Sequence, residues 1–91
     1  MEIISTEKAP AAIGPYSQGM RISGLLFTSG QIPIDPATGE VVEAEITAQA
    51  KQSIENVGQV LAAGGSSFEK VIKTTCFLAD MKDFAAFNEV Y

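Results

Sequence analysis

A helical repeat of apolar residues between positions 43 and 64 constrains the fold of this chain more than any other feature. Glu43 and Glu45 at its start suit the positive end of a helix dipole, and Gly64-Gly65 provides a stop. Because a helix with one apolar stripe has to bury that stripe, we expect it to pack on another layer. The repeat has steps of three or four residues, as along one face of an α-helix, and consists of Ile46, Ala50, Ile54, Val57 and Leu61.

Short apolar segments on both sides of this helix have the composition of β-strands. The candidates are residues 2–5, 18–23, 25–31 and 71–78. Ser23-Gly24 suits a hairpin turn between the second and the third. Three consecutive apolar residues at positions 25–27 predict a strand that is covered on both faces.

A second helix is expected after Asp80, because Asp83 follows at the spacing of a capping box. Phe84, Phe87 and Tyr91 would then share one face of that helix. The order of strand, hairpin, helix, strand and helix predicts an α+β fold, with both helices packed on one face of a sheet. A chain of 91 residues is expected to form a single domain, residues 1–91.

The residue types that are rare or missing exclude several kinds of site. The sequence contains no histidine and one cysteine, so it cannot build a Ser-His-Asp or Cys-His centre, and a zinc site is disfavoured. We therefore expect no metal and no cofactor. The net charge of −5 argues against binding to nucleic acid, whose phosphates it would repel.

Location and redox setting follow from similar arguments. No apolar stretch approaches the length that spans a bilayer, and the first residues lack a secretory pattern. We therefore expect a cytoplasmic protein without a membrane partner. Cys76 lies inside an apolar segment with no base nearby, and is expected to be a small buried apolar residue.

Two short polar segments interrupt the apolar pattern, at residues 14–19 and 28–33. Tyr16 and Ser29 supply hydroxyl groups, and Gln31 supplies an amide, all of which donate and accept hydrogen bonds. Gly30 has no Cβ, so a ligand can approach its backbone closely. The segments predict either a site for a small polar molecule or two ordinary turns.

The same segments resemble the signature stretches of the RidA/YjgF family of reactive-intermediate deaminases. The resemblance is carried by residues 9–18 and 28–33, and it extends through residues 35–40, 48–53, 73–75 and 83–88 in the family's order. It implies a chorismate-mutase-like fold: a mixed sheet backed by two helices, assembled as a homotrimer. Family members continue beyond the position of Tyr91, so the resemblance also implies that the C-terminal strands of the fold are missing from this chain.

The resemblance further implies a reaction, the hydrolysis of enamine or imine intermediates such as 2-aminoacrylate to 2-keto acids and ammonia. Tyr16, Ser29, Gly30 and Asn88 match substrate-binding positions. The family's carboxylate-binding arginine and late glutamate fall beyond Tyr91, so no catalytic residue is identified in this chain.

Each matched residue also has a plain structural interpretation: a core or interface aromatic for Tyr16, a strand-end cap for Ser29, a turn glycine for Gly30 and a solvated helix residue for Asn88. Gln18 and Gln31 flank the pocket residues. The alternative functions are a small-molecule-binding module, or a translation-inhibitor or endoribonuclease-like module, without deaminase turnover.

Overall fold

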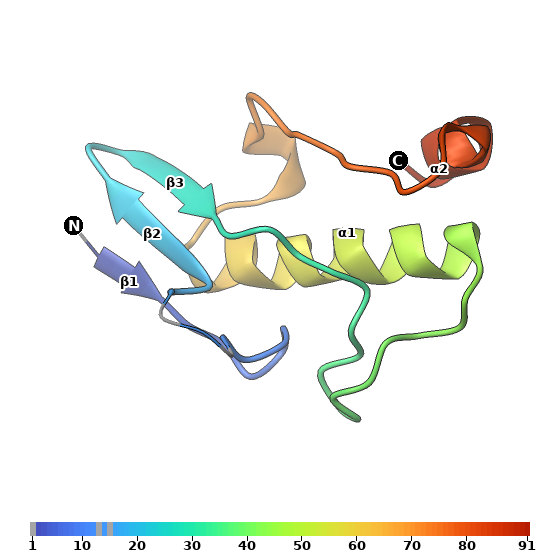
Figure 1. The fold of residues 1–91 in the computed structure, drawn as a ribbon. Helices are drawn as coiled ribbons and strands as arrows, with labels where there is room; N and C mark the ends of the chain where they lie inside the picture. Colours follow the sequence, from blue (N-terminus) through green and yellow to red (C-terminus); the bar gives the residue numbers. More distant parts are fainter. Residues whose placement is uncertain (1, 13, 15) are drawn as a thin grey trace.

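Three short strands form one antiparallel sheet in the computed structural model, which describes residues 2–12, 14 and 16–91. They are β1 (Glu2–Ile4), β2 (Gly19–Ile22) and β3 (Leu25–Thr28), arranged in the order β1-β2-β3 (Figure 1). Ile4 pairs with Gly19, which in turn pairs with Thr28. Ser23 and Gly24 both have positive φ, 52° and 78°. The two-residue turn that these angles allow confirms the hairpin prediction.

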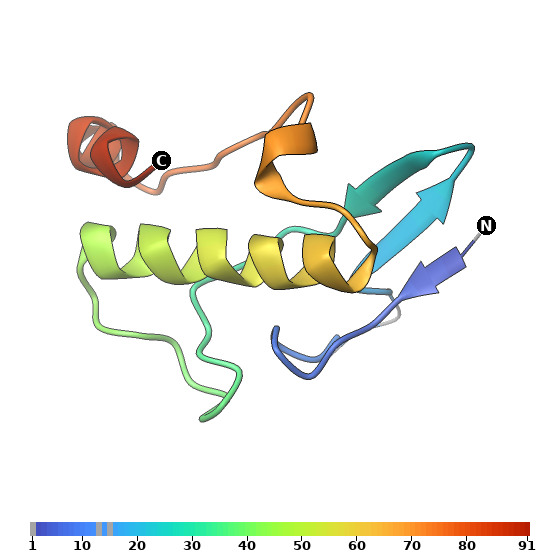
Figure 2. The same ribbon diagram turned by 180° about the vertical axis from the view of Figure 1, so that it is seen from behind.

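The helix α1 (Ile46–Ala63) lies against the sheet near its C-terminal end, as Figure 2 also shows from behind. The helix and the sheet pack closely because two glycines leave room for larger neighbouring side chains. A Cβ on Gly19 would lie 2.9 Å from Cγ1 of Val60, and one on Gly64 would lie 2.6 Å from Cδ2 of Leu26. The small core that results joins the sheet, the loop after β1 and the helix. It consists of Ile4, Ala9 and Val60, with Leu26 packed against them.

The end of α1 follows the glycine prediction. Gly65 has a φ of 78°, and its N–H donates to the carbonyl oxygen of Ala62 at 3.0 Å. The N–H of Ser66 donates to the carbonyl oxygen of Leu61 at 2.8 Å. This pair of bonds is a Schellman motif, which satisfies carbonyls that the last turn would otherwise leave free.

The C-terminal part forms a short 3-10 turn, η2 (Met81–Asp83), followed by the helix α2 (Phe84–Val90). The N–H of Lys82 donates to the Asp80 carboxylate at 2.9 Å, which confirms that the helical segment starts at Asp80. The rings of Phe87 and Tyr91 stack with centroids 5.6 Å apart. Figures 1 and 2 place α2 over the N-terminal half of α1, away from the sheet.

The predicted strand at residues 71–78 is wrong for the described chain. After the 3-10 turn η1 (Phe68–Lys70), these residues run extended but pair with no strand within the part described. Ile72 is 86% exposed and Phe77 is 91% exposed. Cys76 is exposed as well, so the expectation that it is buried is also wrong. A strand is stabilised by its neighbours, and composition alone does not supply one.

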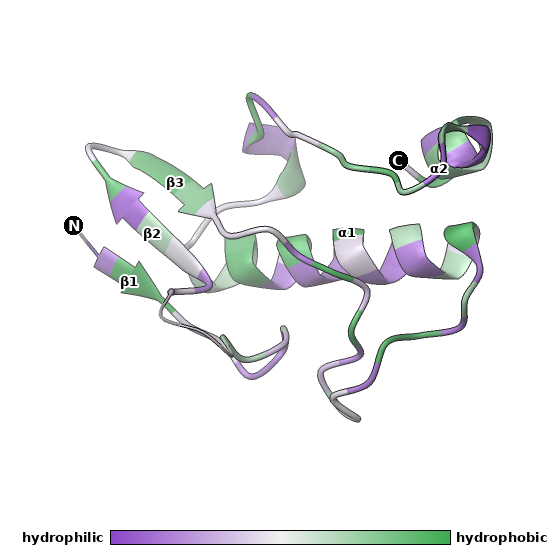
Figure 3. Cartoon of the chain, in the orientation of Figure 1, coloured by the Kyte–Doolittle hydropathy of each residue, from purple (hydrophilic) through white to green (hydrophobic). Residues whose placement is uncertain are grey.

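Apolar residues remain uncovered on β3 too. Leu26 packs toward the core, whereas Leu25 and Phe27 are 47% and 57% exposed. Figure 3 shows the apolar colour along β3 and along the extended segment that leads to α2. The prediction that this strand is covered on both faces is therefore not met within one chain, since α1 covers only one face. No helix in residues 2–12, 14 or 16–91 is long and apolar enough to cross a membrane.

Candidate functional site

The two polar segments that the sequence singles out lie side by side at the end of β3. The N–H of Ser29 donates to the carbonyl oxygen of Gln18 at 2.9 Å. The Ser29 hydroxyl donates to the carbonyl oxygen of Ser17. These bonds continue the β2–β3 pairing by one residue, so residues 16–18 and residues 28–30 meet at one end of the two paired strands.

Tyr16 lies next to this junction with about half of its side chain exposed. Its N–H donates to the carbonyl oxygen of Gly14 at 2.8 Å. The ring lines an open cavity of about 710 Å³ between β1, the loop of residues 5–12 and residues 16–18. Tyr16 is therefore accessible rather than part of the core. Ile13 and Pro15 lie outside the described residues.

Gly30 is exposed, and a Cβ added to it would meet no atom within 4 Å. The fold of one chain does not require a glycine here, in contrast to Gly19 and Gly64. Its backbone is accessible to a ligand, as the close-approach interpretation requires.

Asn88 lies elsewhere. It is exposed on α2, which packs on α1 and not on the sheet. Among the described residues, no hydrogen bond links Asn88 to Tyr16, Ser29 or Gly30, and neither of the two cavities is lined by it. The structure of one chain thus places Tyr16, Ser29 and Gly30 near one end of the β2–β3 pair and leaves Asn88 apart, and of these four residues only Tyr16 lines either of the two cavities.

Two buried amides organise this region, and neither role was predicted from the sequence. Gln18 is 4% exposed, and its carboxamide bonds to the loop of residues 6–10. Asn56, on α1, is 1% exposed and donates to the carbonyl oxygens of Ile32 and Ile34 at 3.1 and 2.9 Å. Asn56 lies outside the apolar repeat of residues 46, 50, 54, 57 and 61, so that repeat did not indicate its burial. Gln31 has a smaller role, since its amide donates to the carbonyl oxygen of Ser29 at 3.2 Å.

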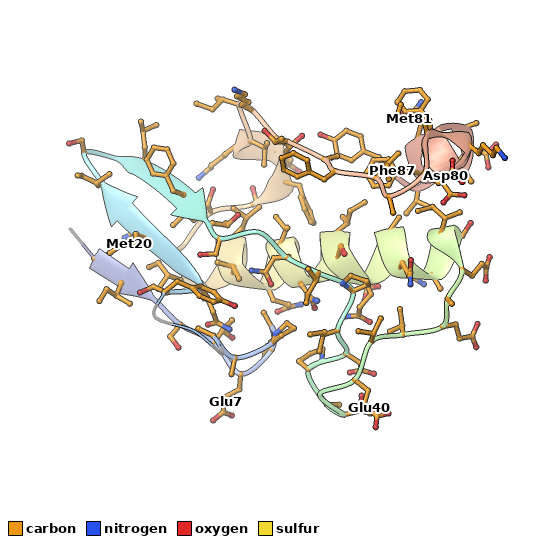
Figure 4. All side chains as sticks on the ribbon, viewed as in Figure 1. Glu7, Met20, Glu40, Asp80, Met81 and Phe87 are labelled. Carbon is orange, nitrogen blue, oxygen red and sulfur yellow. The ribbon has the colours of Figure 1, made fainter. Side chains whose placement is uncertain are left out.

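Glu7 lines the same cavity as Tyr16, Ser17 and Gln18. Arg21, the only arginine, pairs with Glu2 at 2.9 Å across β1 and β2. Figure 4 shows Glu7 and Glu40 on loops below α1, with side chains that point away from the helix, whereas Asp80 lies beside α2. Within residues 2–12, 14 and 16–91, no three acidic or cysteine side chains gather closely enough to hold a metal ion.

A second cavity, of about 490 Å³, shares Pro36 with the first. It is lined by Lys8, Asp35, Glu55 and Phe68 among others, and by none of the four predicted site residues. It therefore provides an internal comparison for experiments that map where a ligand binds.

Comparison with known proteins identifies the family. A family model described as Endoribonuclease L-PSP matches residues 6–91. The chain belongs to this family. A RutC family protein of Pyrococcus abyssi is 51% identical over 90 residues, which cover 99% of this chain and 71% of that protein. The 2-iminobutanoate/2-iminopropanoate deaminase of Mus musculus is 48% identical, over 99% of this chain and 67% of the mouse protein.

Solved structures of family members share the fold. Escherichia coli TdcF with bound serine superposes with a TM-score of 0.96 at 49% identity, over 100% of this chain and 71% of that chain. The E. coli YjgF gene product gives 0.95 at 48% identity, over 99% and 70%. These likenesses confirm the α+β class, the YjgF-type fold and the RidA/YjgF resemblance.

Proposed function

We propose that the chain is an imine deaminase that hydrolyses 2-imino acids, such as the imine form of 2-aminoacrylate, to 2-keto acids and ammonia. In this reaction the oxygen of a water molecule bonds to the imine carbon. The C–N bond of the resulting carbinolamine then breaks, nitrogen leaves as ammonia, and the carbonyl remains. The observation that carries the proposal is the junction of the Tyr16 and Ser29 segments, in a chain whose mammalian relatives at 47–49% identity are named for this activity.

The geometry supports an orienting role for Ser29 in this reaction. Its hydroxyl hydrogen is used in the bond to the carbonyl of Ser17, so the lone pairs of its oxygen are left to accept from a ligand N–H or from water. The chain has no histidine to act as a base. A serine without a base is a weak nucleophile, so we assign orientation of substrate or water to Ser29, and not covalent catalysis.

Tyr16 and Gly30 complete this part of the site. The accessible phenol of Tyr16 would orient the ligand, and the open backbone of Gly30 would lie against it. Positioning of this kind lowers the barrier by fixing the reacting groups relative to one another. Arg21 is the one cationic residue among residues 16–30, and its side chain pairs with Glu2. No other residue of this segment offers a positive charge to the substrate carboxylate.

We also propose that the working form is a homotrimer in the cytoplasm, with the pocket at subunit boundaries. The half-exposed apolar residues Leu25 and Phe27 support a covered face in the assembly, as does the unpaired edge of β3. In a trimer, Asn88 of one subunit would be able to reach the site of a neighbouring subunit, although it lies apart from the site of its own chain.

The experiment generates 2-aminoacrylate with a serine dehydratase and follows ammonia release in the presence of the 91-residue chain, with the mouse deaminase as positive control. We expect a weak acceleration over buffer, well below that of the mouse control, that the Ser29→Ala substitution reduces. No acceleration at any protein concentration, with an active control, would refute the deaminase proposal.

The second candidate is an endoribonuclease, favoured by the description of the family. The net charge of −5 opposes the binding of a polyanion. A cleavage assay on single-stranded RNA separates the two: RNA cleavage without ammonia release would replace the first proposal by the second.

A further inference from the structure

Gln18 makes an unusually complete set of hydrogen bonds for a side chain next to a candidate site. Its Oε1 accepts from the N–H of Thr6 at 2.6 Å. Its Nε2 lies within hydrogen-bond distance of the carbonyl oxygens of Thr6 at 3.0 Å, Ala9 at 3.2 Å and Pro10 at 2.7 Å. A carboxamide has two N–H donors, so three carbonyls share two hydrogens. One side chain therefore holds the backbone of the loop at residues 6–10 at three positions.

The backbone of the same residue faces the opposite way. The carbonyl oxygen of Gln18 accepts from the N–H of Ser29 at 2.9 Å, and its neighbour Ser17 receives the Ser29 hydroxyl. Tyr16 precedes them in the chain. Gln18 thus stands between the loop on one side and the Ser29 segment on the other, and it lines the cavity that Tyr16 also lines.

Burial makes this connection rigid. Gln18 is 4% exposed, and Ala9, whose carbonyl it contacts, is 2% exposed and belongs to the core with Ile4 and Val60. A buried amide that loses its partners cannot exchange them for water, so its bonds are costly to break. The loop is therefore fixed to the core through Ala9 and to the site through Gln18.

We propose that Gln18 is a positioning residue: its carboxamide fastens the loop of residues 6–10 to the segment that carries Tyr16 and receives Ser29, and so sets where the Ser29 hydroxyl lies. The kinetic part of this inference rests on the proposed function, because it takes imine hydrolysis as the reaction. The structural part, the coupling of Gln18 to Ser29, does not depend on it.

The test compares Gln18→Met, which keeps the length of the side chain and removes the amide, with Gln59→Met, on an exposed position of α1. Each is combined with Ser29→Ala. If Gln18 acts through Ser29, Gln18→Met lowers kcat/KM by about 10- to 100-fold, the range expected when a site group is misplaced. The loss falls mainly on kcat, and it shrinks to less than about threefold in the Ser29→Ala background, because coupled residues are non-additive. An equal loss in both backgrounds would overturn the proposal.

Amide hydrogen exchange supplies a readout that needs no turnover. Gln18→Met is expected to speed exchange of the Ser29 N–H, relative to the most protected amides of α1, by about tenfold or more, whereas Gln59→Met leaves it unchanged. Ser29 exchange that is unaffected in a folded Gln18→Met protein would also overturn the proposal. If the unsubstituted chain shows no deaminase activity, the function has failed and the exchange result alone decides the role of Gln18. Should Gln18→Met not fold, Gln18→Asn, which keeps the amide but is shorter by one methylene, gives the same readouts.

Discussion

Replacement of Gly30 by alanine tests whether this glycine is needed for folding or for ligand binding. In the structure an added Cβ meets nothing within 4 Å, and Gly30 is not among the glycines with a positive φ. A Gly→Ala change at a compatible backbone position shifts the free energy of unfolding by no more than about 1 kcal/mol, commonly toward greater stability. We therefore expect Gly30→Ala to fold normally.

Its effect on the proposed activity should be large. If a ligand carboxylate lies against the Gly30 backbone, the new methyl group occupies its place and a hydrogen bond to a charged group is lost. Such a bond contributes about 1.5–3 kcal/mol, which corresponds to about a 10- to 150-fold decrease in kcat/KM. Ammonia release measures the activity, and urea denaturation followed by circular dichroism measures the stability.

Gly19→Ala is the matched control. Its Cβ would lie 2.9 Å from Cγ1 of Val60, which is fully buried, and 3.1 Å from the carbonyl oxygen of Phe27. Overpacking of this kind costs about 1–3 kcal/mol, so this variant should lose stability where Gly30→Ala does not. A Gly30→Ala protein with unchanged kcat/KM would refute the reasoning, because it would make Gly30 a plain turn residue.

Three further predictions concern the site, the chain and the assembly. Ser29→Ala should weaken deamination without changing the products; mass spectrometry that detects a covalent adduct on Ser29 during turnover would contradict the orienting role. The 91-residue polypeptide should have a kcat/KM at least about 100-fold below that of the mouse relative, because the carboxylate-binding arginine that the family resemblance implies has no match in this sequence, and two charge-assisted bonds contribute about 1.5–3 kcal/mol each. Equal values for the two proteins would disprove this. Light scattering at micromolar concentration should report a homo-oligomer, most simply a trimer, and a stable monomer would count against the assembly.

Local signals account for the parts of the fold that the sequence predicted well. The helix predicted at residues 43–64 is observed as Ile46–Ala63. Its apolar repeat and its glycine stop both lie in this segment, so neither signal depends on distant residues. The Ser23-Gly24 turn was equally local, since it depends on two residues that adopt positive φ. The motif that contains Ser29 was found through its resemblance to a family, whereas its contact with Ser17 required the structure.

The errors concern relations between distant residues. Residues 71–78 have strand-forming side chains, yet whether they pair depends on a partner that composition does not reveal. The exposed Cys76 follows from the same cause. The roles of Gln18 and Asn56 were missed because each of them bonds to backbone carbonyls that lie 8 to 24 residues away. The sequence shows that an amide is present, and only the folded structure shows which carbonyl oxygens it bonds to.

The central claim is that a 2-keto or 2-imino acid binds where the Tyr16, Ser29 and Gly30 segments meet. The most direct measurement is a titration of the ¹⁵N-labelled chain with pyruvate, the 2-keto acid formed from 2-aminoacrylate, observed as amide chemical-shift changes. We predict saturable shifts at the amides of Tyr16, Ser29 and Gly30, which weaken in Gly30→Ala. Shifts confined to the cavity lined by Lys8 and Glu55, or no saturable shift at all, would contradict the claim.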